Sequence, residues 1–181
     1  LRRQRQMCIR DSLFTFIKLA IKLKGLFQMS ITSGSIITDF SLINQDGTLI
    51  DVSDFQSDYL IVFFYPKDDT PGCTKESCKF RDLYNEFKLL GCNLVGISAD
   101  NSASHKQFAS KFKLNFDLLV DKDYKISKYF GTFFVSKEFG NSIKRNTYLI
   151  DKNKEVIHAW ESISNPENHP DDVLKFVQNL N

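Results

Sequence analysis

The sequence predicts an α/β fold in which a mixed central sheet carries helices on both faces and follows an N-terminal β-hairpin. Two apolar runs, 60–65 and 93–99, alternate with segments of helical period, which is typical of strands in a sheet covered on both faces. Asp46-Gly47 separates two shorter runs, and this dipeptide strongly favours a hairpin turn. The chain of 181 residues is long enough for one domain with a sizeable core, and its hydrophobic content of 42% favours a folded one.

The first half of the chain predicts a hairpin, a central strand and a long helix. Segments 36–43 and 48–52 form the hairpin, and 53–55 begins a short helix or turn. The continuous apolar strand 60–65 is expected at the centre of the sheet. The helix after it ends at Gly91, because glycine commonly stops a helix. Its apolar face, spaced at i, i+3, i+4 and i+7, consists of Phe80, Leu83, Tyr84 and Phe87.

The second half predicts two further helix and strand units and a second hairpin. After the strand 93–99, Asp100 or Asn101 caps a helix that carries Phe108 and Phe112 on one face. The remaining elements are a strand at 118–120, a short helix marked by Ile126, Tyr129 and Phe130, a hairpin of 145–150 and 155–160, and a final helix with Pro170 at its first position.

The charge of the chain is unevenly distributed. Seven of the 24 Lys and Arg residues lie in 1–28, where only one of the 22 Asp and Glu residues lies. The remainder therefore holds 17 basic and 21 acidic side chains, a net charge of −4. This mildly acidic body has no basic stripe, so a nucleic acid partner is not expected.

Residues 1–28 are interpreted as a segment apart from the domain, which we expect to span 29–181. The segment is basic and partly amphipathic, as an organelle leader is, but it also resembles translated sequence upstream of a start at Met29. Lysines interrupt it too often for a membrane span, so no membrane partner is expected. We expect a cytoplasmic protein, or a mitochondrial or plastid one if the leader is genuine.

The cysteines favour thiol chemistry over a structural or metal-binding role. The chain has four, Cys8, Cys73, Cys78 and Cys92, which is too few for a disulfide scaffold of this size. Their spacing and the scattered histidines do not fit a zinc site. Cys73 is expected in the first turn of a helix, where partial positive charge favours the thiolate, and Cys78 follows as a possible partner. Cys92 begins an apolar strand and is expected in the core.

The motif Pro66-x-x-x-Thr70-x-x-Cys73 resembles the active-site pattern of the peroxiredoxins. Together with Cys78 and the segment Arg145-x-Thr147-Tyr148-Leu149-Ile150-Asp151, it resembles the bacterioferritin-comigratory (PrxQ) subfamily. The similarity runs from about Ser35 to the C-terminus. It implies a thioredoxin-like fold and a monomeric thiol peroxidase that reduces hydrogen peroxide and organic hydroperoxides. It also implies no metal or organic cofactor, and recycling by thioredoxin or a similar dithiol protein.

The resemblance also implies a role for each residue of the motif. Cys73 corresponds to the peroxidatic cysteine and Cys78 to the resolving cysteine. Thr70 and Arg145 correspond to the pair that orients the peroxide, and Pro66 corresponds to the residue that shields the pocket. The stretch between Gly140 and Arg145 is shorter than is typical of the family, which leaves the breadth of substrates open.

The chemistry explains why these residue types are needed. Arg145 stays charged at any relevant pH and can stabilise a thiolate, and its donors together with the Thr70 hydroxyl can stabilise the leaving oxygen. Gly72 leaves room for the substrate because it has no side chain. In an ideal helix, Cα atoms five residues apart are separated by about 8.6 Å. A disulfide needs roughly 4.4–6.8 Å. The helix start between Cys73 and Cys78 is therefore expected to unwind in each cycle, and the polar stretch 75–77 is consistent with a loosely held start.

Several candidate residues also have a simpler interpretation. Thr70 is expected to cap the helix, with Pro71 at its first position. Glu76 and Arg81 are interpreted as solvated helix charges, although either could contact Arg145. His105 is assigned to a polar helix face, and His158 and His169 are interpreted as structural or exposed.

Two other function classes compete with a peroxidase. A disulfide oxidoreductase predicts Cys-x-x-Cys at the helix start, where this chain has no second cysteine at that spacing. A redox sensor or chaperone-like binder predicts an added interaction segment, for which only 1–28 is available. Neither class explains why Thr70 and Arg145 occur together.

Overall fold

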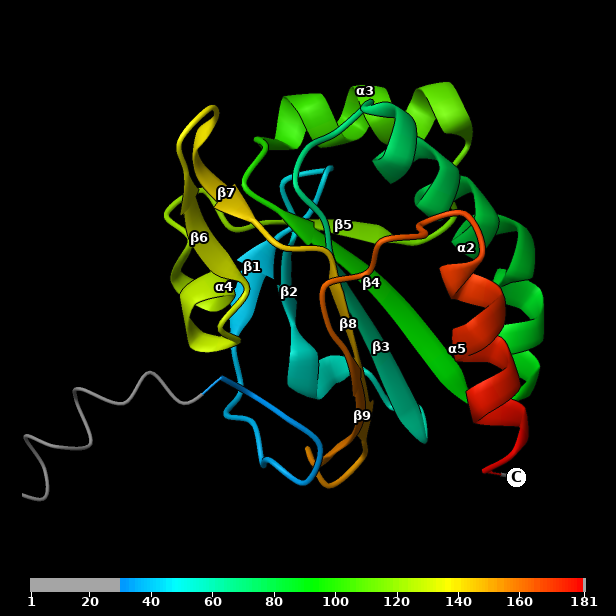
Figure 1. The fold of residues 1–181 in the computed structure, drawn as a ribbon. Coiled ribbons are helices and arrows are strands. Elements are labelled where there is room, and N and C mark those ends of the chain that lie inside the picture. Colours follow the sequence, from blue (N-terminus) through cyan, green and yellow to red (C-terminus); the bar gives the residue numbers. More distant parts are fainter. Residues whose placement is uncertain (1–29, 181) are drawn as a thin grey trace, which may run out of the picture. The chain divides into compact units, whose positions relative to one another are not determined.

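A mixed five-stranded sheet forms the centre of the computed structural model, which describes residues 30–180 (Figure 1). The strand order is β5-β4-β3-β8-β9. β3 pairs in parallel with β4 and antiparallel with β8, so the continuous apolar strand is central, as predicted. The strands are β3 (Tyr59–Phe64), β4 (Cys92–Ser98), β5 (Asp117–Val120), β8 (Asn146–Asp151) and β9 (Val156–Trp160).

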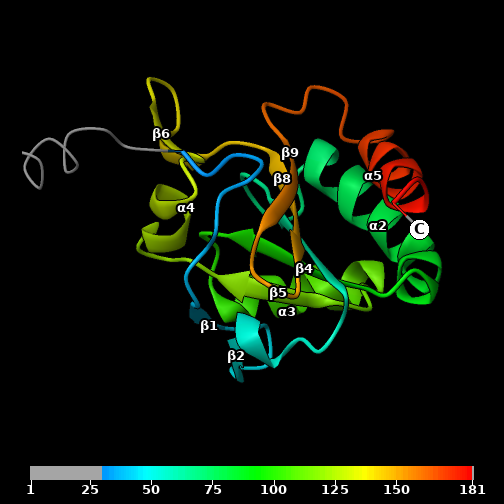
Figure 2. The same ribbon diagram turned by 90° about the horizontal axis from the view of Figure 1, so that it is seen from below.

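Helices lie on both faces of this sheet (Figure 2). Alternate residues of β3 point to opposite faces, so Ile61 and Phe63 pack into one core and Val62 and Phe64 into the other. The first core is covered by α2 (Pro71–Leu89), α3 (Ser102–Phe112) and α5 (His169–Gln178). The second core is covered by α4 (Lys125–Tyr129) and by residues of the stretch 31–52. The predicted α/β architecture is confirmed.

The N-terminal hairpin is present but shorter than predicted. It consists of β1 (Ser41–Ile43) and β2 (Leu49–Asp51), followed by the 3-10 helix η1 (Val52–Asp54). Its turn contains Gly47 at φ +77°, a left-handed conformation that glycine adopts without strain. The predicted strand began at residue 36, but Ile36 forms only an isolated bridge with Glu155.

A second small sheet, β6 (Phe133–Ser136) with β7 (Gly140–Ile143), has no counterpart in the prediction from sequence. The short stretch before Arg145, for which no strand was predicted, pairs with β6 as a hairpin. Phe139, at its turn, has 76% of its surface exposed, so the hairpin is held by its ladder and its base rather than by burial of its tip.

The start of α3 and the end of α2 fit the residues predicted to bound them. Asn101 caps α3, because its side chain accepts a hydrogen bond from the backbone N–H of Ser104 at 2.9 Å. Gly91 follows Leu90, the C-cap of α2, at φ +74°, the left-handed conformation common after a helix. Every helix within 30–180 is too short or too polar to cross a bilayer.

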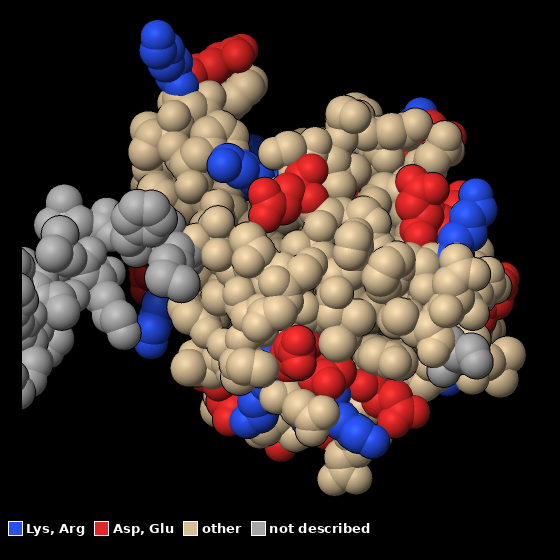
Figure 3. Space-filling view, turned by 60° about the horizontal axis from the view of Figure 1, so that its bottom comes forward, with Lys and Arg blue, Asp and Glu red and all other residues tan. Residues whose placement is uncertain are grey.

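Charges of both signs are mixed on the face of the molecule drawn in Figure 3. Lys and Arg lie close to Asp and Glu in small groups around a broad uncharged centre, so this face has no continuous basic surface. Residues Ile31–Asn181 form one compact unit. The segment 1–28, predicted to be a leader or a non-native extension, lies outside the described residues.

Candidate active site

Cys73 lies in the first turn of α2, as predicted, two residues after Pro71. The strand β3 ends at Phe64, and the loop 65–70 leads directly from it into this turn. Only 1% of the Cys73 surface is exposed, and the residue packs with the aromatic core under α2. The sulfur therefore lies in a largely desolvated position at a helix N-terminus, where electrostatic interactions are stronger than in water.

Arg145, between β7 and β8, brings a positive charge to this sulfur. Its Nη2 donates a hydrogen bond to Cys73 Sγ at 3.2 Å, and its side chain is 12% exposed. Burial opposes the charge, but the Glu76 carboxylate and Cys73 outweigh it and raise the pKa of Arg145. The predicted pair of Cys73 and Arg145, which are far apart in the sequence, is thus assembled.

Glu76 is the second partner of Arg145 and corrects a prediction. Its side chain is fully buried rather than solvated, and it accepts a hydrogen bond from Arg145 Nη1. Burial raises the pKa of Glu76 to about 7, although the charge of Arg145 opposes the shift. The other carboxylate oxygen, Oε1, has no hydrogen-bond partner among the described residues. The guanidinium therefore bridges Cys73 and Glu76, which are one helical turn apart.

Thr70, Gly72 and Pro66 lie at or just before the start of α2, and each has different surroundings. Thr70 is at the N-cap position, but its side chain caps nothing, and the hydroxyl instead donates to the Lys67 carbonyl oxygen at 3.2 Å. A Cβ on Gly72 would lie 3.4 Å from Arg145 Nη2, so glycine lets the guanidinium lie close to the helix start. Pro66 follows β3 and is exposed.

Cys78 lies five residues further along α2 and is partly buried. Burial raises the pKa of its thiol, while the charge of Arg81 opposes the shift. Arg81 Nη1 lies 3.6 Å from Cys78 Sγ and also donates to the carbonyl oxygen of Phe112 in α3. Arg81 therefore contacts the second cysteine and not Arg145, and it is only partly solvated.

The helix between the two cysteines is intact, and both thiols are free. Cα atoms at this spacing in a helix are about 8.6 Å apart. A disulfide cannot form across that distance. The polar stretch 75–77 was expected to leave the helix start loosely held, with few buried contacts. This prediction is wrong for Glu76 and Ser77, which are completely buried. The Ser77 hydroxyl, like Glu76 Oε1, has no partner among the described residues. Burying such groups costs free energy, so this helix start is held at a cost.

The loop between β9 and α5 also borders the site, which the sequence reasoning missed. The backbone N–H of Ile163 donates to the Arg145 carbonyl oxygen at 3.0 Å. A Cβ on Gly72 would lie 3.4 Å from Pro166, and Lys75 pairs with Glu167 at 2.7 Å. The loop has no regular pattern in the sequence, and only the fold brings it to the helix start.

The histidines and Cys92 complete the outcome for the candidate residues. His105 is fully buried against Asp68, so its assignment to a polar helix face was wrong. His169 is buried and contacts the Thr147 hydroxyl at 2.8 Å, and His158 stacks on a neighbouring ring. Cys92 is 2% exposed, which confirms its place in the core.

Comparison with known proteins identifies similar chains. The AhpC/TSA family matches residues 33–159. A peroxiredoxin Q from Sedum lineare, named as chloroplastic, is 45% identical over 150 residues, which is 83% of this chain and 80% of that protein. Among solved structures, the peroxidoxin BcpB of Mycobacterium tuberculosis superposes with a TM-score of 0.78 at 33% identity, covering 83% of this chain and 99% of its own.

A third comparison concerns the substrate of a relative. The bacterioferritin comigratory protein of Xanthomonas campestris superposes with a TM-score of 0.72 at 30% identity, covering 78% of this chain and 91% of its own. That structure was described in relation to its alkyl peroxide reduction activity. The residues matched by the AhpC/TSA family, 33–159, include the strand, loop and helix that hold Cys73 and the strand that follows Arg145.

Proposed function

Because this chain belongs to the AhpC/TSA family, in its peroxiredoxin Q (bacterioferritin-comigratory) branch, and is a peroxidase of the oxidoreductase class, we propose a two-cysteine cycle within one chain. Cys73 reduces hydrogen peroxide and organic hydroperoxides, and Cys78 resolves the product as an intramolecular disulfide. The observation that carries the proposal is the 3.2 Å contact of Arg145 Nη2 with Cys73 Sγ in the first turn of α2. In the cell this reaction would serve antioxidant defence and redox homeostasis.

The first step is attack by the Cys73 thiolate on one peroxide oxygen. The O–O bond breaks, the sulfur keeps the attacked oxygen as sulfenic acid, and the leaving oxygen takes a proton to become water or an alcohol. Arg145 supports this step twice, because its charge stabilises the thiolate and its N–H groups can stabilise the leaving oxygen. Since the Thr70 hydroxyl donates to Lys67, its lone pairs are free to accept a hydrogen bond from the peroxide.

The second step joins the two cysteines. The Cys78 thiol attacks the Cys73 sulfur, the S–S bond forms, the S–O bond breaks, and water leaves. The intact α2 separates the two residues too far for this bond, so the first turns of the helix must unwind. The buried and unpartnered polar groups of Glu76 and Ser77 support that proposal, because unwinding returns both to water.

The third step restores the thiols. A dithiol protein such as thioredoxin reduces the Cys73–Cys78 disulfide and becomes oxidised to its own disulfide. We propose that the enzyme works as a monomer, which size-exclusion chromatography of both redox forms would test. The chloroplastic relatives support a plastid location as the alternative to the cytoplasm. Imaging of a fluorescent fusion to the full chain distinguishes the two.

The test is the mass of the reduced full chain after one equivalent of hydrogen peroxide. We expect the loss of two hydrogens, with Cys73 and Cys78 in one crosslinked peptide. A stable oxygen adduct on Cys73 with Cys78 still free would replace the proposal by a one-cysteine mechanism that needs an outside thiol. An unchanged mass within seconds would remove the peroxidase proposal itself.

A further inference from the structure

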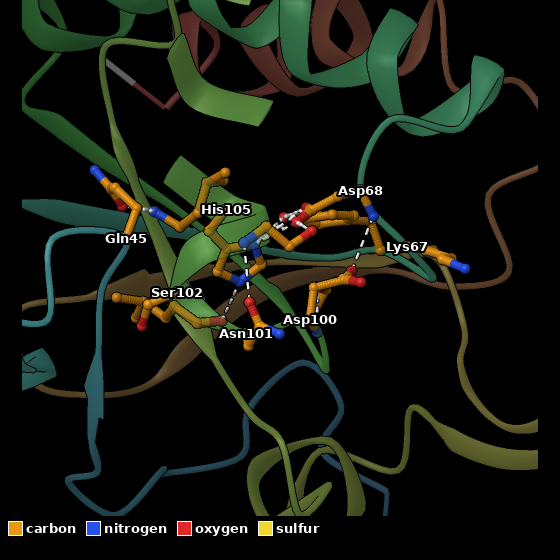
Figure 4. A network of polar contacts seen from close by, with 12 residues as sticks. Gln45, Lys67, Asp68, Asp100, Asn101, Ser102 and His105 are labelled. Atoms are coloured by element: carbon orange, nitrogen blue, oxygen red, sulfur yellow. Dashed lines mark hydrogen bonds and ion pairs between the residues drawn. The ribbon is translucent and has the colours of Figure 1, made fainter. Parts of the chain in front are cut away.

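A buried polar network lies beside the active site and takes no part in the cycle described above (Figure 4). Its centre is the Asp68 carboxylate, in the loop between β3 and α2, with a side chain only 4% exposed. The carboxylate accepts hydrogen bonds from Tyr65 Oη at 2.8 Å and Ser104 Oγ at 2.7 Å. His105 Nδ1 lies 2.9 Å away, and the two side chains point toward one another.

His105 connects this carboxylate to the sheet. Its ring is fully buried in α3, and Nε2 lies 3.3 Å from the Leu119 carbonyl oxygen in β5. Each ring nitrogen therefore faces an oxygen, the Asp68 carboxylate on one side and the Leu119 carbonyl on the other. Burial, and then the Asp68 charge, raise the pKa of Tyr65, which therefore remains a donor. The loop is thus fixed to a helix, a strand and the end of β3.

One peptide group transmits this fixation to Thr70. The peptide between Lys67 and Asp68 donates through its N–H to Asp100 Oδ2 at 2.9 Å, and its carbonyl oxygen accepts the Thr70 hydroxyl at 3.2 Å. Asp100 Oδ2 is itself held by Ser98 Oγ at 2.7 Å. The direction of the Thr70 hydroxyl therefore follows a peptide plane whose N–H is held by Asp100 and which is joined to the Asp68 carboxylate at the centre of the network.

A buried polar network of this kind does not stabilise a fold more than apolar packing would. Burying a carboxylate and an imidazole has a desolvation cost, and apolar side chains of similar size often stabilise a core equally well. The ring of Tyr65 is already fixed by stacking on Phe63 at a centroid distance of 5.5 Å. The polar groups add directionality, and that directionality reaches the loop that leads to Cys73.

We propose that Asp68 and His105 are positioning residues that hold the Thr70 hydroxyl and the start of α2 in the geometry required for attack on the peroxide. The inference rests on the proposed function of Cys73. Neither residue touches the reacting atoms, and both act through the peptide between Lys67 and Asp68. Displacing reacting groups by about 1 Å can cost about a hundredfold in rate.

The test compares two reactions of Cys73 in the full chain. Reduction of hydrogen peroxide needs both the thiolate and its positioned neighbours, whereas alkylation by iodoacetamide needs the thiolate alone. The variants are His105→Phe, which keeps a ring and removes both nitrogens, and Tyr65→Phe, a milder loss of one donor. His105→Asn keeps a donor near Nδ1. The buried Val156→Ala, in β9 and remote from the network, controls for lost stability.

We expect His105→Phe to lower the second-order rate constant for peroxide by about tenfold to a hundredfold while the alkylation of Cys73 changes by less than about threefold. His105→Asn should recover part of the loss, Tyr65→Phe should lose less, and Val156→Ala should leave both reactions unchanged. An equal loss in both reactions, or no loss in either, overturns the positioning role. If wild-type Cys73 reacts with peroxide no faster than free cysteine, the proposed function fails first, a result that the variants do not affect.

Discussion

Glu76 is the residue at which the site departs most from an ordinary helix surface. It is a fully buried carboxylate with one oxygen on Arg145 and the other without a partner among the described residues. Removing both partners of a buried ion pair is often nearly neutral, whereas removing one leaves the other uncompensated. Glu76 therefore holds the guanidinium against Cys73. It also places a buried carboxylate with incomplete hydrogen bonding at the helix start.

The pH dependence of stability tests this account of Glu76. Its pKa is about 7 in the folded protein, against an ordinary value of 4.5, so the folded state binds the proton more tightly. Its contribution to stability is fully present below about pH 4.5 and is lost as the pH rises through about 7. We expect wild type to lose stability relative to Glu76→Gln over that range, measured by urea unfolding of the reduced chain.

The comparison with Glu76→Gln has an internal control. The pKa of His169 is lowered to about 4 by burial and by the charge of Arg145, so its contribution has the opposite sign, present above about pH 6.5 and lost as the pH falls. Because this contribution occurs in both chains, it largely cancels in their difference. A difference in stability that stays constant from pH 4.5 to 8 would contradict the proposed origin of the shift.

At the scale of elements, the first two turns of α2 are well packed but contain buried polar atoms without hydrogen-bond partners among the described residues, in Glu76 and Ser77. Phe80 and Phe87 anchor the rest of the helix in the core, and Arg81 ties it to the end of α3. The stretch from Cys73 to Cys78 lies before these anchors. Unwinding can therefore stop near Arg81 while the remainder of the helix stays in place.

The variant Ser77→Ala tests whether unpartnered groups promote this unwinding. Burial of a hydroxyl without a partner destabilises the folded state by about 1–3 kcal/mol, and the substitution removes this cost. The alanine also has a higher helix propensity than serine. We expect the reduced chain to gain about 1 kcal/mol in stability and disulfide formation to slow about fivefold, because each 1.36 kcal/mol is a factor of ten in rate. Urea unfolding and rapid-quench mass analysis measure the two effects.

Ser110→Ala is the matched control, because Ser110 lies exposed in α3 and its replacement changes propensity alone. Equal effects of the two alanines on disulfide formation would show that the buried hydroxyl does not matter.

Much of the element order could be predicted from the sequence because long apolar periods determine it. The central strand, the face of α2 and the cap of α3 follow from such patterns. Glu76 and His105 were assigned to solvent from their polarity alone, although Glu76 lies at i−4 from Phe80 and His105 at i−3 from Phe108, on the buried faces. Their spacing from these aromatic residues indicated burial, but the prediction followed their polarity instead.

The contacts of the site could not be predicted in the same way. The loop that contains Ile163 and Pro166 reaches the helix start only through the fold, and the β6–β7 hairpin has too short a pattern to recognise. What the sequence could supply was the motif around Cys73 and its resemblance, which named the residues but not their distances.

At the scale of the whole molecule, the site is assembled from segments that are far apart in the sequence. The helix start supplies Cys73, the link between β7 and β8 supplies Arg145, and the loop before α5 contacts the Arg145 backbone and the helix start. All of these segments lie in the compact unit Ile31–Asn181. We therefore propose that the compact unit alone carries the proposed function.

Deleting residues 1–28, so that the chain begins at Met29, tests that division. We expect the rate of peroxide reduction and the midpoint of thermal unfolding to stay within error of those of the full chain, because all the site residues named above lie within the compact unit. Stopped-flow kinetics and calorimetry measure the two quantities. A loss of either would assign a structural role to the N-terminal segment.

Cys92 has a practical consequence for all of these experiments. It begins β4 with 2% of its surface exposed, and burial, followed by the charge of Asp58, raises the pKa of its thiol to about 12. We expect a thiol so protected to react with an alkylating agent only after a larger opening of the domain than the unwinding of the α2 start requires. Labelling of Cys92 thus reports this larger opening, while labelling of Cys73 and Cys78 reports local events in α2. The labelling rate of Cys92 is therefore an internal reference, measured in the same sample, for the labelling rates of Cys73 and Cys78.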